Sequence, residues 1–242
     1  MRRRFFVEQF GGGRAVMEGD AAHHLGHVLR AQSGQLYELS DGSSAWLARI
    51  ESVSRHRVEF ALIEQLPALP SAVDVILLLS IVKFDCFEWA IEKATELGVG
   101  RIVPLAAARS EKGLLSAAAK RSQRWQKILV EASQQSRRLR VPHLGDPAKP
   151  AQAFAAQTAA FRLMLSERSD APSFRSSFEG ANRPRPVTAA LAIGPEGGWT
   201  DDELAVARAS GFREAFLGQL ILRTETAVVA ALATLNYALS PG

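Results

Sequence analysis

Cysteine is almost absent from this chain, because Cys86 is the only one among 242 residues. A single thiol excludes an intrachain disulfide framework and favours a reducing compartment. Long hydrophobic runs are missing as well, since the longest, Val75 to Val82, is too short to cross a bilayer. At the N-terminus, Glu8 and the glycines at 11–13 interrupt the apolar residues before a signal peptide is complete. We therefore expect a cytoplasmic protein without a membrane anchor.

The usual signatures of metal and nucleophile sites are also lacking. His23 and His27 stand four residues apart, a spacing that can bind metal, but no third ligand accompanies them. The chain has no Gly-x-Ser-x-Gly elbow for a Ser-His-Asp triad, and it has neither a Walker loop nor a dinucleotide-binding glycine motif. We expect no metal cofactor.

Basic residues outnumber acidic ones, with 29 Lys and Arg against 25 Asp and Glu and a net charge of +4. This excess favours a polyanionic partner. The alternative is a soluble enzyme that is basic without having such a partner. Seven of the bases lie between Lys120 and Arg140, against Glu131 alone, which predicts a stripe suited to phosphates. A solvated helix face is the alternative. Arg4 and Arg30 in the N-terminal region favour nucleic acid.

Two regions of different pattern divide the chain. Residues 1–68 hold short alternating segments between turn residues, which predicts a small β-barrel, and Asp20 is expected to cap a short helix within it. Pro67 and Pro70 bracket an expected linker. Residues 72–242 alternate buried strands with helices, which predicts an α/β domain with a mainly parallel sheet. The expected strands are 75–81, 101–105, 161–165, 189–193 and 212–217, and the expected helices include 86–97, 116–136, one begun by a capping box at 200–203, and 224–239.

Two loops near the C-terminus carry the strongest functional signal. One reads Ile193-Gly194-Pro195-Glu196-Gly197-Gly198, and the other runs from Leu217 to Ala227. Both leave the carboxyl ends of expected strands, as does Leu165-Ser166-Glu167, and ligands of open α/β sheets bind at that end. We therefore expect one pocket between them. The alternative for the first loop is a tight turn before a capped helix.

The second loop adds chemistry to the pocket, because Arg223, Thr224, Glu225 and Thr226 open the last helix. The two hydroxyls and the free amides of a first helical turn offer hydrogen bonds to an anion or a heterocycle. The alternatives are that Arg223 pairs with Glu225 at the surface or is only a charge at the helix terminus, and that the threonines only cap the helix.

Several segments together are similar to one known family. They are Arg4-Phe5-Phe6, His24-Leu25, Val28-Leu29-Arg30, 92–99, 124–128, Gln135-Ser136 and Pro142, and the most specific are 194–198 and 217–227. In these segments the chain resembles the bacterial 16S ribosomal RNA uracil-N3 methyltransferases of the SPOUT superfamily. Arg137 is a departure, because many relatives carry glycine after Gln-Ser.

The resemblance implies a PUA-like RNA-binding barrel in residues 1–68 and, in residues 72–242, a methyltransferase domain whose chain forms a trefoil knot. It implies a homodimer that uses S-adenosylmethionine to methylate uridine 1498 of 16S rRNA in the 30S subunit. Arg223 is the implied catalytic residue, and Glu225, Glu196 or solvent takes the proton from uracil N3. The implied cofactor pocket comprises Leu165, Glu167, Ile193, Gly194, Pro195, Glu196, Gly197, Gly198, Leu217, Gly218, Ile221, Leu222 and Thr224. The implied RNA contacts are Arg4, His24, Arg30, Arg124, Arg137 and Arg138.

Two other functions remain open at this point. One is a different methyltransferase of the same superfamily, acting on a ribose 2′-oxygen or on guanine N1. The other is an RNA-binding assembly factor without catalytic activity, which predicts no binding of S-adenosylmethionine.

Overall fold

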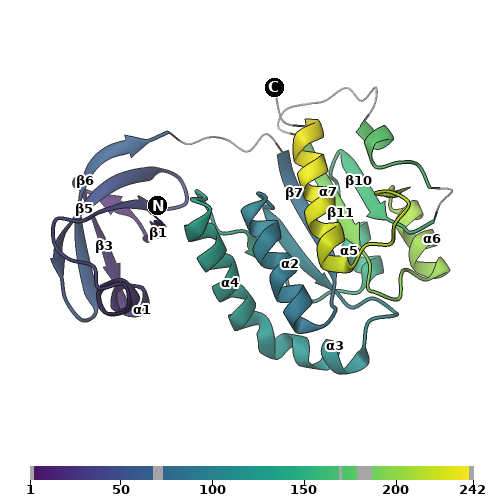
Figure 1. Cartoon of the computed structure of the whole chain (residues 1–242), viewed down its shortest axis with the longest axis horizontal. Coiled ribbons are helices and arrows are strands. Elements are labelled where there is room, and N and C mark those ends of the chain that lie inside the picture. Colours follow the sequence, from purple (N-terminus) through teal and green to yellow (C-terminus); the bar gives the residue numbers. More distant parts are fainter. Residues whose placement is uncertain (1–2, 68–72, 169–170, 179–186, 240–242) are drawn as a thin grey trace. The chain divides into compact units, whose positions relative to one another are not determined.

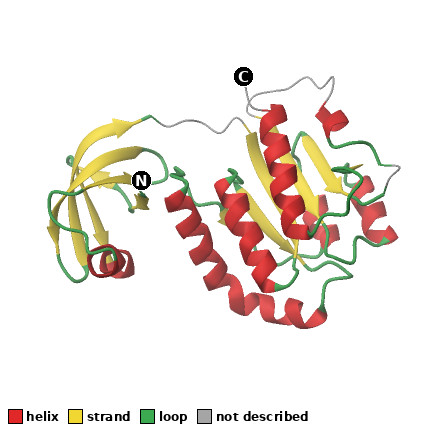
Figure 2. Ribbon diagram, viewed as in Figure 1, coloured by secondary structure: helices red, strands yellow, loops and turns green. Residues whose placement is uncertain are grey.

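The computed structural model describes residues 3–67, 73–168, 171–178 and 187–239. The chain divides into two compact units, of residues 1–70 with 131–141 and of residues 71–130 with 142–242 (Figures 1 and 2). Segment 131–141 thus belongs to the first unit, although it lies far along the chain from the rest of that unit. Most of the linker expected between Pro67 and Pro70 lies outside the described residues.

The first unit is a curled six-stranded sheet. Its strands are β1 (Arg4–Phe6), β2 (Phe10–Gly11), β3 (Arg14–Glu18), β4 (Leu36–Ser40), β5 (Ala45–Val53) and β6 (Arg57–Leu66). They lie in the order β1-β4-β5-β6-β3-β2, and only the β1–β4 pair is parallel. Irregular register between β5 and β6 marks bulges, which bend a strand and help it to curl. The expected barrel-like unit is confirmed (Figure 2).

A short helical segment closes the core of this unit. It consists of α1 (Gly19–His23) and a π-helical turn, η1 (His24–Val28), and its Ala22 and Leu25 are fully buried against Phe60 and other apolar side chains. The expectation that Asp20 caps this helix is wrong. Glu18 is the N-cap, and Asp20 lies in the first turn, where its charge favours the helix dipole instead.

Segment 131–141 is held in the first unit by hydrogen bonds and an ion pair. Arg4 pairs with the buried Glu38 at 3.0 Å and donates to the carbonyl of Arg137 at 2.7 Å, while Ser40 Oγ donates to the carbonyl of Leu139 at 2.7 Å. Arg137 has a φ of 55°, in the left-handed region that favours glycine after a helix. Glycine would adopt this conformation with less strain than arginine does.

The second unit is built on a fully parallel sheet. Its strands are β7 (Val73–Ser80), β8 (Arg101–Leu105), β9 (His143–Leu144), β10 (Phe161–Leu165), β11 (Val187–Ile193) and β12 (Arg213–Ala215), in the order β12-β10-β11-β7-β8-β9. The predicted parallel sheet is confirmed. The two-residue β9 was not predicted, because so short a strand has no period to read.

The helical segments after β7 are α2 (Phe84–Glu96), α3 (Lys112–Ala118), η2 (Ala119–Arg121), α4 (Ser122–Gln135), α5 (Pro150–Ala155), η3 (Arg175–Phe178), α6 (Asp201–Ala209) and α7 (Thr224–Leu239). The end of α4, from Glu131, belongs to the first unit. The prediction of a single helix over 116–136 is wrong, because the 3-10 turn η2 separates α3 from α4. The capping box is confirmed: Thr200 Oγ1 accepts from the Glu203 amide, and Glu203 Oε2 accepts from the Thr200 amide. No helix within the described ranges is long and apolar enough to span a membrane.

Helices cover both faces of the parallel sheet. Leu78 of β7 packs in one core cluster with Phe154 of α5 and Leu204 of α6. The alternate residues of β7, such as Leu77, are buried on the opposite face, where α2 and α7 lie side by side (Figure 1). Burial on both faces explains the continuous apolar run of β7.

Candidate active site

A cleft of about 910 Å³ opens at the carboxyl ends of the parallel strands, within the second unit. All thirteen residues expected to form the cofactor pocket line it: Leu165, Glu167, Ile193, Gly194, Pro195, Glu196, Gly197, Gly198, Leu217, Gly218, Ile221, Leu222 and Thr224. The loops after β10, β11 and β12 therefore meet, as the position of ligand sites in open α/β sheets predicts.

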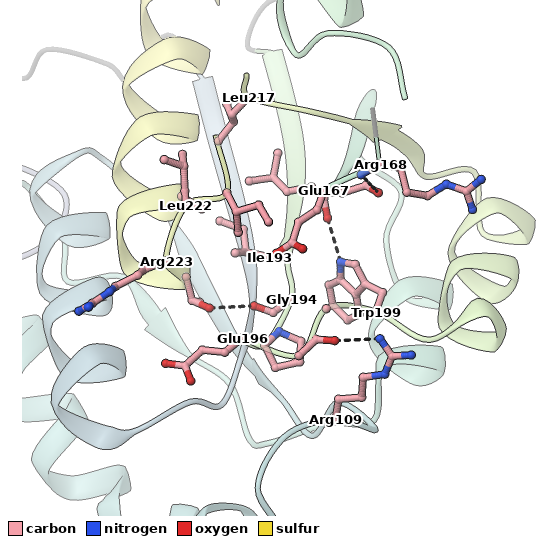
Figure 3. Close-up of a pocket in the computed structure, with 18 of the residues that line it drawn as sticks. Arg109, Glu167, Arg168, Ile193, Gly194, Glu196, Trp199, Leu217, Leu222 and Arg223 are labelled. Carbon is pink, nitrogen blue, oxygen red and sulfur yellow. Dashed lines mark hydrogen bonds between the residues drawn. The ribbon is translucent and has the colours of Figure 1, made fainter. Parts of the chain in front are cut away.

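Trp199 joins the first two of these loops (Figure 3). Its indole nitrogen donates to the carbonyl of Leu165 at 2.9 Å, and its ring lies against Gly194. A Cβ on Gly194 would lie 3.0 Å from Trp199 Cε2, which is closer than side-chain carbons normally approach. Gly194 thus leaves room for the buried indole, and Trp199 was missed in the sequence because it reads as an ordinary core residue.

Thr224 joins the third loop to the second. Its hydroxyl donates to the carbonyl of Gly194 at 3.2 Å, and the residue is only 5% exposed. The hydroxyl therefore points across the cleft edge instead of capping its own helix. Thr226, by contrast, is exposed.

Arg109 brings in a fourth loop, which follows β8 and was not predicted to belong to the site. Arg109 Nη1 donates to the carbonyl of Gly197 at 2.8 Å (Figure 3), and the amide of Ala108 donates to Glu203 at 2.8 Å. Both bonds hold this loop against the glycine loop and the start of α6. The sequence signal was weak, because nothing marks Arg109 apart from its position after a parallel strand.

Arg223 borders the cleft, but its guanidinium is exposed and extends away from Ile193 and Gly194 (Figure 3). Among the described residues the Arg223 guanidinium makes no hydrogen bond or ion pair, so the alternative of a surface pair between Arg223 and Glu225 is wrong. Its catalytic role stays a prediction.

Glu225 lies beside Cys86 and is not among the residues that line the cleft. Burial of the thiol, followed by the negative charge and hydrogen bonding of Glu225, raises the pKa of Cys86 above its usual value. Glu225 Oε2 is inaccessible to solvent and has no hydrogen-bond partner in the described structure. Glu196, in contrast, is exposed and lines the cleft.

The residues expected to contact RNA have different surroundings. Arg4 is largely buried in its pair with Glu38, and Arg124 pairs with Glu88 of α2 at 2.7 Å. Arg138 is half-buried, and this burial lowers its pKa. Arg137 is exposed and lies 3.5 Å from Glu38, while His24 and Arg30 are exposed near η1. RNA contact by these side chains stays a prediction. In the part of the chain that the structure describes, no three His, Cys, Asp or Glu side chains gather as metal ligands.

The fold and the cleft define a class of protein, which comparison with known families identifies. Residues 69–236 match the model of the RNA methyltransferase domain, and residues 18–63 match the RNA methyltransferase PUA domain. The chain is therefore an RNA methyltransferase that carries a PUA domain before its α/β domain.

Individual relatives give the particular family. The chain is 33% identical to the ribosomal RNA small subunit methyltransferase E of Synechocystis, over 88% of this chain and 70% of the relative. It is 32% identical to the Bacillus subtilis protein of that name, over 90% and 88%. The crystal structure of the Neisseria gonorrhoeae protein of that name, bound to S-adenosylmethionine, matches with a TM-score of 0.85 and 29% identity over 98% of both chains. A Legionella pneumophila methyltransferase in complex with the same cofactor matches with a TM-score of 0.87 and 28% identity, again over 98% of each. The chain belongs to the ribosomal RNA small subunit methyltransferase E family.

Proposed function

We propose that this chain is an S-adenosylmethionine-dependent methyltransferase of 16S rRNA that methylates N3 of uridine 1498 in the 30S subunit. The observation that carries the proposal is the cleft in which the loops after β10, β11 and β12 meet. The relatives solved with S-adenosylmethionine support the choice of cofactor, because they share the fold over nearly the whole chain.

The residues of the cleft fit this cofactor. Its volume of about 910 Å³ lies within the range of ligand sites. Leu217 and Leu222 offer apolar surface for an adenine ring, while the carboxylate of Glu167 offers acceptors for hydroxyl or amino groups. Gly197 and Gly198 let the main chain approach closely. When bound, the cofactor supplies an electrophilic methyl group on a sulfonium sulfur.

Uracil N3 carries a proton and becomes nucleophilic only when that proton leaves. Arg223 is always charged, so its role is to stabilise the negative charge that develops on a uracil oxygen. Its exposed side chain has no partner to lose within the described residues before it turns toward a bound base. Glu196 or solvent suits the proton transfer better than Glu225, because Glu196 lines the cleft and Glu225 does not.

The first unit and the basic residues of 120–140 provide the RNA contacts in this proposal. A PUA domain match and the exposed bases Arg30 and Arg137 support it, since phosphate contacts require accessible cations. The RNA-modifying role, together with the single cysteine, supports a cytoplasmic location.

A homodimer is also part of the proposal. Large apolar side chains are exposed in the second unit: Leu220 at 82%, Ile221 at 76%, Tyr237 at 90% and Trp89 at 44%. Tyr237 and Trp89 belong to the neighbouring helices α7 and α2. Contact with a second copy of the chain would remove these side chains from water. A trefoil knot in the C-terminal chain, implied by the family resemblance, belongs to the same proposal.

The test is methyl transfer to 30S subunits that lack the modification, followed by nuclease digestion and mass spectrometry of the nucleosides. We expect 3-methyluridine among the nucleosides, and mass spectrometry of the oligonucleotide fragments should place it at position 1498. A 2′-O-methylated nucleoside or 1-methylguanosine would favour another enzyme of the superfamily. Absence of S-adenosylmethionine binding in calorimetry would favour the assembly factor.

A further inference from the structure

Three histidine rings are stacked at one end of the first unit. The imidazoles of His23 and His27 lie 5.1 Å apart between centroids and are inclined by 16°, and His56 lies 6.4 Å from His23 at 25°. His23 ends α1, His27 lies in the π-helical turn η1, and His56 lies in the turn between β5 and β6. His27 and His56 are exposed, while His23 is half-buried.

The fold positions this stack through main-chain contacts. The amide of Gly19 donates to the carbonyl of His56 at 3.1 Å, which ties the β5–β6 turn to the start of α1. A Cβ on Gly26 would lie 3.0 Å from Val53 Cγ1, so η1 packs closely on the end of β5. π-Helical turns are rare and occur frequently at functional sites.

The stack is not arranged as a metal site. Nearly parallel rings direct their nitrogen atoms outward in their own planes, so the nitrogens do not converge on one point. Within residues 3–67, none of the three imidazoles makes a hydrogen bond. His27 and His56 are exposed, and each is stacked on the half-buried His23.

The surface around the stack suits nucleic acid. The same two segments carry exposed apolar side chains, Val28 at 59% and Val53 at 37%, and exposed cations, Arg30 and Arg55. RNA is recognised largely through unpaired bases that stack on aromatic side chains, histidine included, while nearby cations contact the phosphates.

We propose that His23, His27 and His56 form a stacking site for an unpaired base of the RNA. The inference rests on the proposed RNA substrate and adds a contact on the first unit, apart from the methyl-transfer cleft. Loss of one exposed ring lowers RNA affinity on the order of tenfold, because each base stacked on an aromatic ring strengthens binding by about that factor. Stacking involves no phosphate, so the dependence of affinity on salt stays the same.

The experiment measures binding of the full chain to a fluorescein-labelled single-stranded RNA oligonucleotide and to 30S subunits over a series of salt concentrations. The pH is kept constant, near 8, in all titrations. His27→Ala and His56→Ala should weaken RNA binding without changing its dependence on salt. His27→Phe and His56→Phe should keep the wild-type affinity, because phenylalanine keeps an aromatic ring at each position. Arg30→Ala, in contrast, should reduce the slope by about one. His143→Ala, at an exposed histidine of the second unit, is the matched control and should bind as the wild type does.

Three results would overturn the inference alone: unchanged binding in both alanine variants, phenylalanine variants as weak as the alanine ones, or a reduced salt slope in the histidine variants. Melting temperatures show that each variant is folded, and the changes are at exposed positions. A wild-type chain that binds neither RNA nor 30S subunits would instead overturn the proposed function, and this inference with it.

Discussion

Replacing Gly194 with alanine tests whether the glycine loop is shaped by the indole beneath it. The added Cβ would meet Trp199 Cε2 at 3.0 Å and Nε1 at 3.1 Å, where carbon atoms prefer about 3.5–4.0 Å. Trp199 has little freedom to retreat, since it is 8% exposed, packs near Phe154 and donates to Leu165 at 2.9 Å. Either the loop or the indole has to move.

The cost of this overpacking is about 1–3 kcal/mol. If the loop keeps its native position, the strain lowers the free energy of unfolding by that amount. If the loop moves outward to relieve the strain, cofactor binding has to return the loop to its native position. The affinity for S-adenosylmethionine then falls on the order of 5- to 150-fold. The Thr224 hydroxyl bond to the Gly194 carbonyl would be disturbed in the second case.

The assay combines thermal unfolding with calorimetric titration of S-adenosylmethionine. Gly113→Ala is the control, because a Cβ there would meet only Glu111 Oε1 at 3.7 Å, an ordinary contact, and alanine suits α3 better than glycine. Gly194→Ala should lower the melting temperature, the affinity or both, and Gly113→Ala neither. If Gly194→Ala has the melting temperature and the cofactor affinity of the wild type, the proposal that the Trp199 indole requires glycine at position 194 is refuted.

Three further predictions concern the walls of the cleft. Arg109→Ala should weaken S-adenosylmethionine binding by roughly fivefold in calorimetry, since one hydrogen bond that holds Gly197 is lost. The control is Arg208→Ala, because Arg208 pairs with Glu214 and neither residue lines the cleft. Equal affinities in the two variants would contradict the prediction. Arg223→Ala should lower the single-turnover rate of methyl transfer to 30S subunits on the order of a hundredfold with little change in cofactor affinity, and Arg223→Lys should rescue it poorly; near-equal rates in all three proteins would exclude the catalytic role. Cys86 should react with iodoacetamide at pH 8.5 more slowly than free cysteine, because its raised pKa leaves less thiolate. Glu225→Gln should speed the reaction by removing a negative charge beside the thiol. An unchanged rate in that variant would contradict the contact between Glu225 and Cys86.

Much of the α/β architecture followed from local pattern. The continuous apolar run of β7 and the limits of β8 and β10 were readable because strands buried on both faces are mostly apolar, with Arg101 and Arg162 as the only charged residues of β8 and β10. The capping box at Thr200 was readable for the same local reason, since its partners are three residues apart. By contrast, the interruption between α3 and α4 was not, because the helical period continues through it.

The sequence by itself also determined which loops meet, since parallel strands place their carboxyl ends at one edge of a sheet. Only the tertiary structure decided how they are held together. The bonds from Trp199 to Leu165 and from Arg109 to Gly197 join residues 34 and 88 positions apart. Such contacts leave no periodic trace. The sequence predicted an RNA contact for Arg4, but it did not show that Arg4 is paired with the distant Glu38 and largely buried. It also did not show the direction of the Arg223 side chain, which depends on the conformation of the preceding loop.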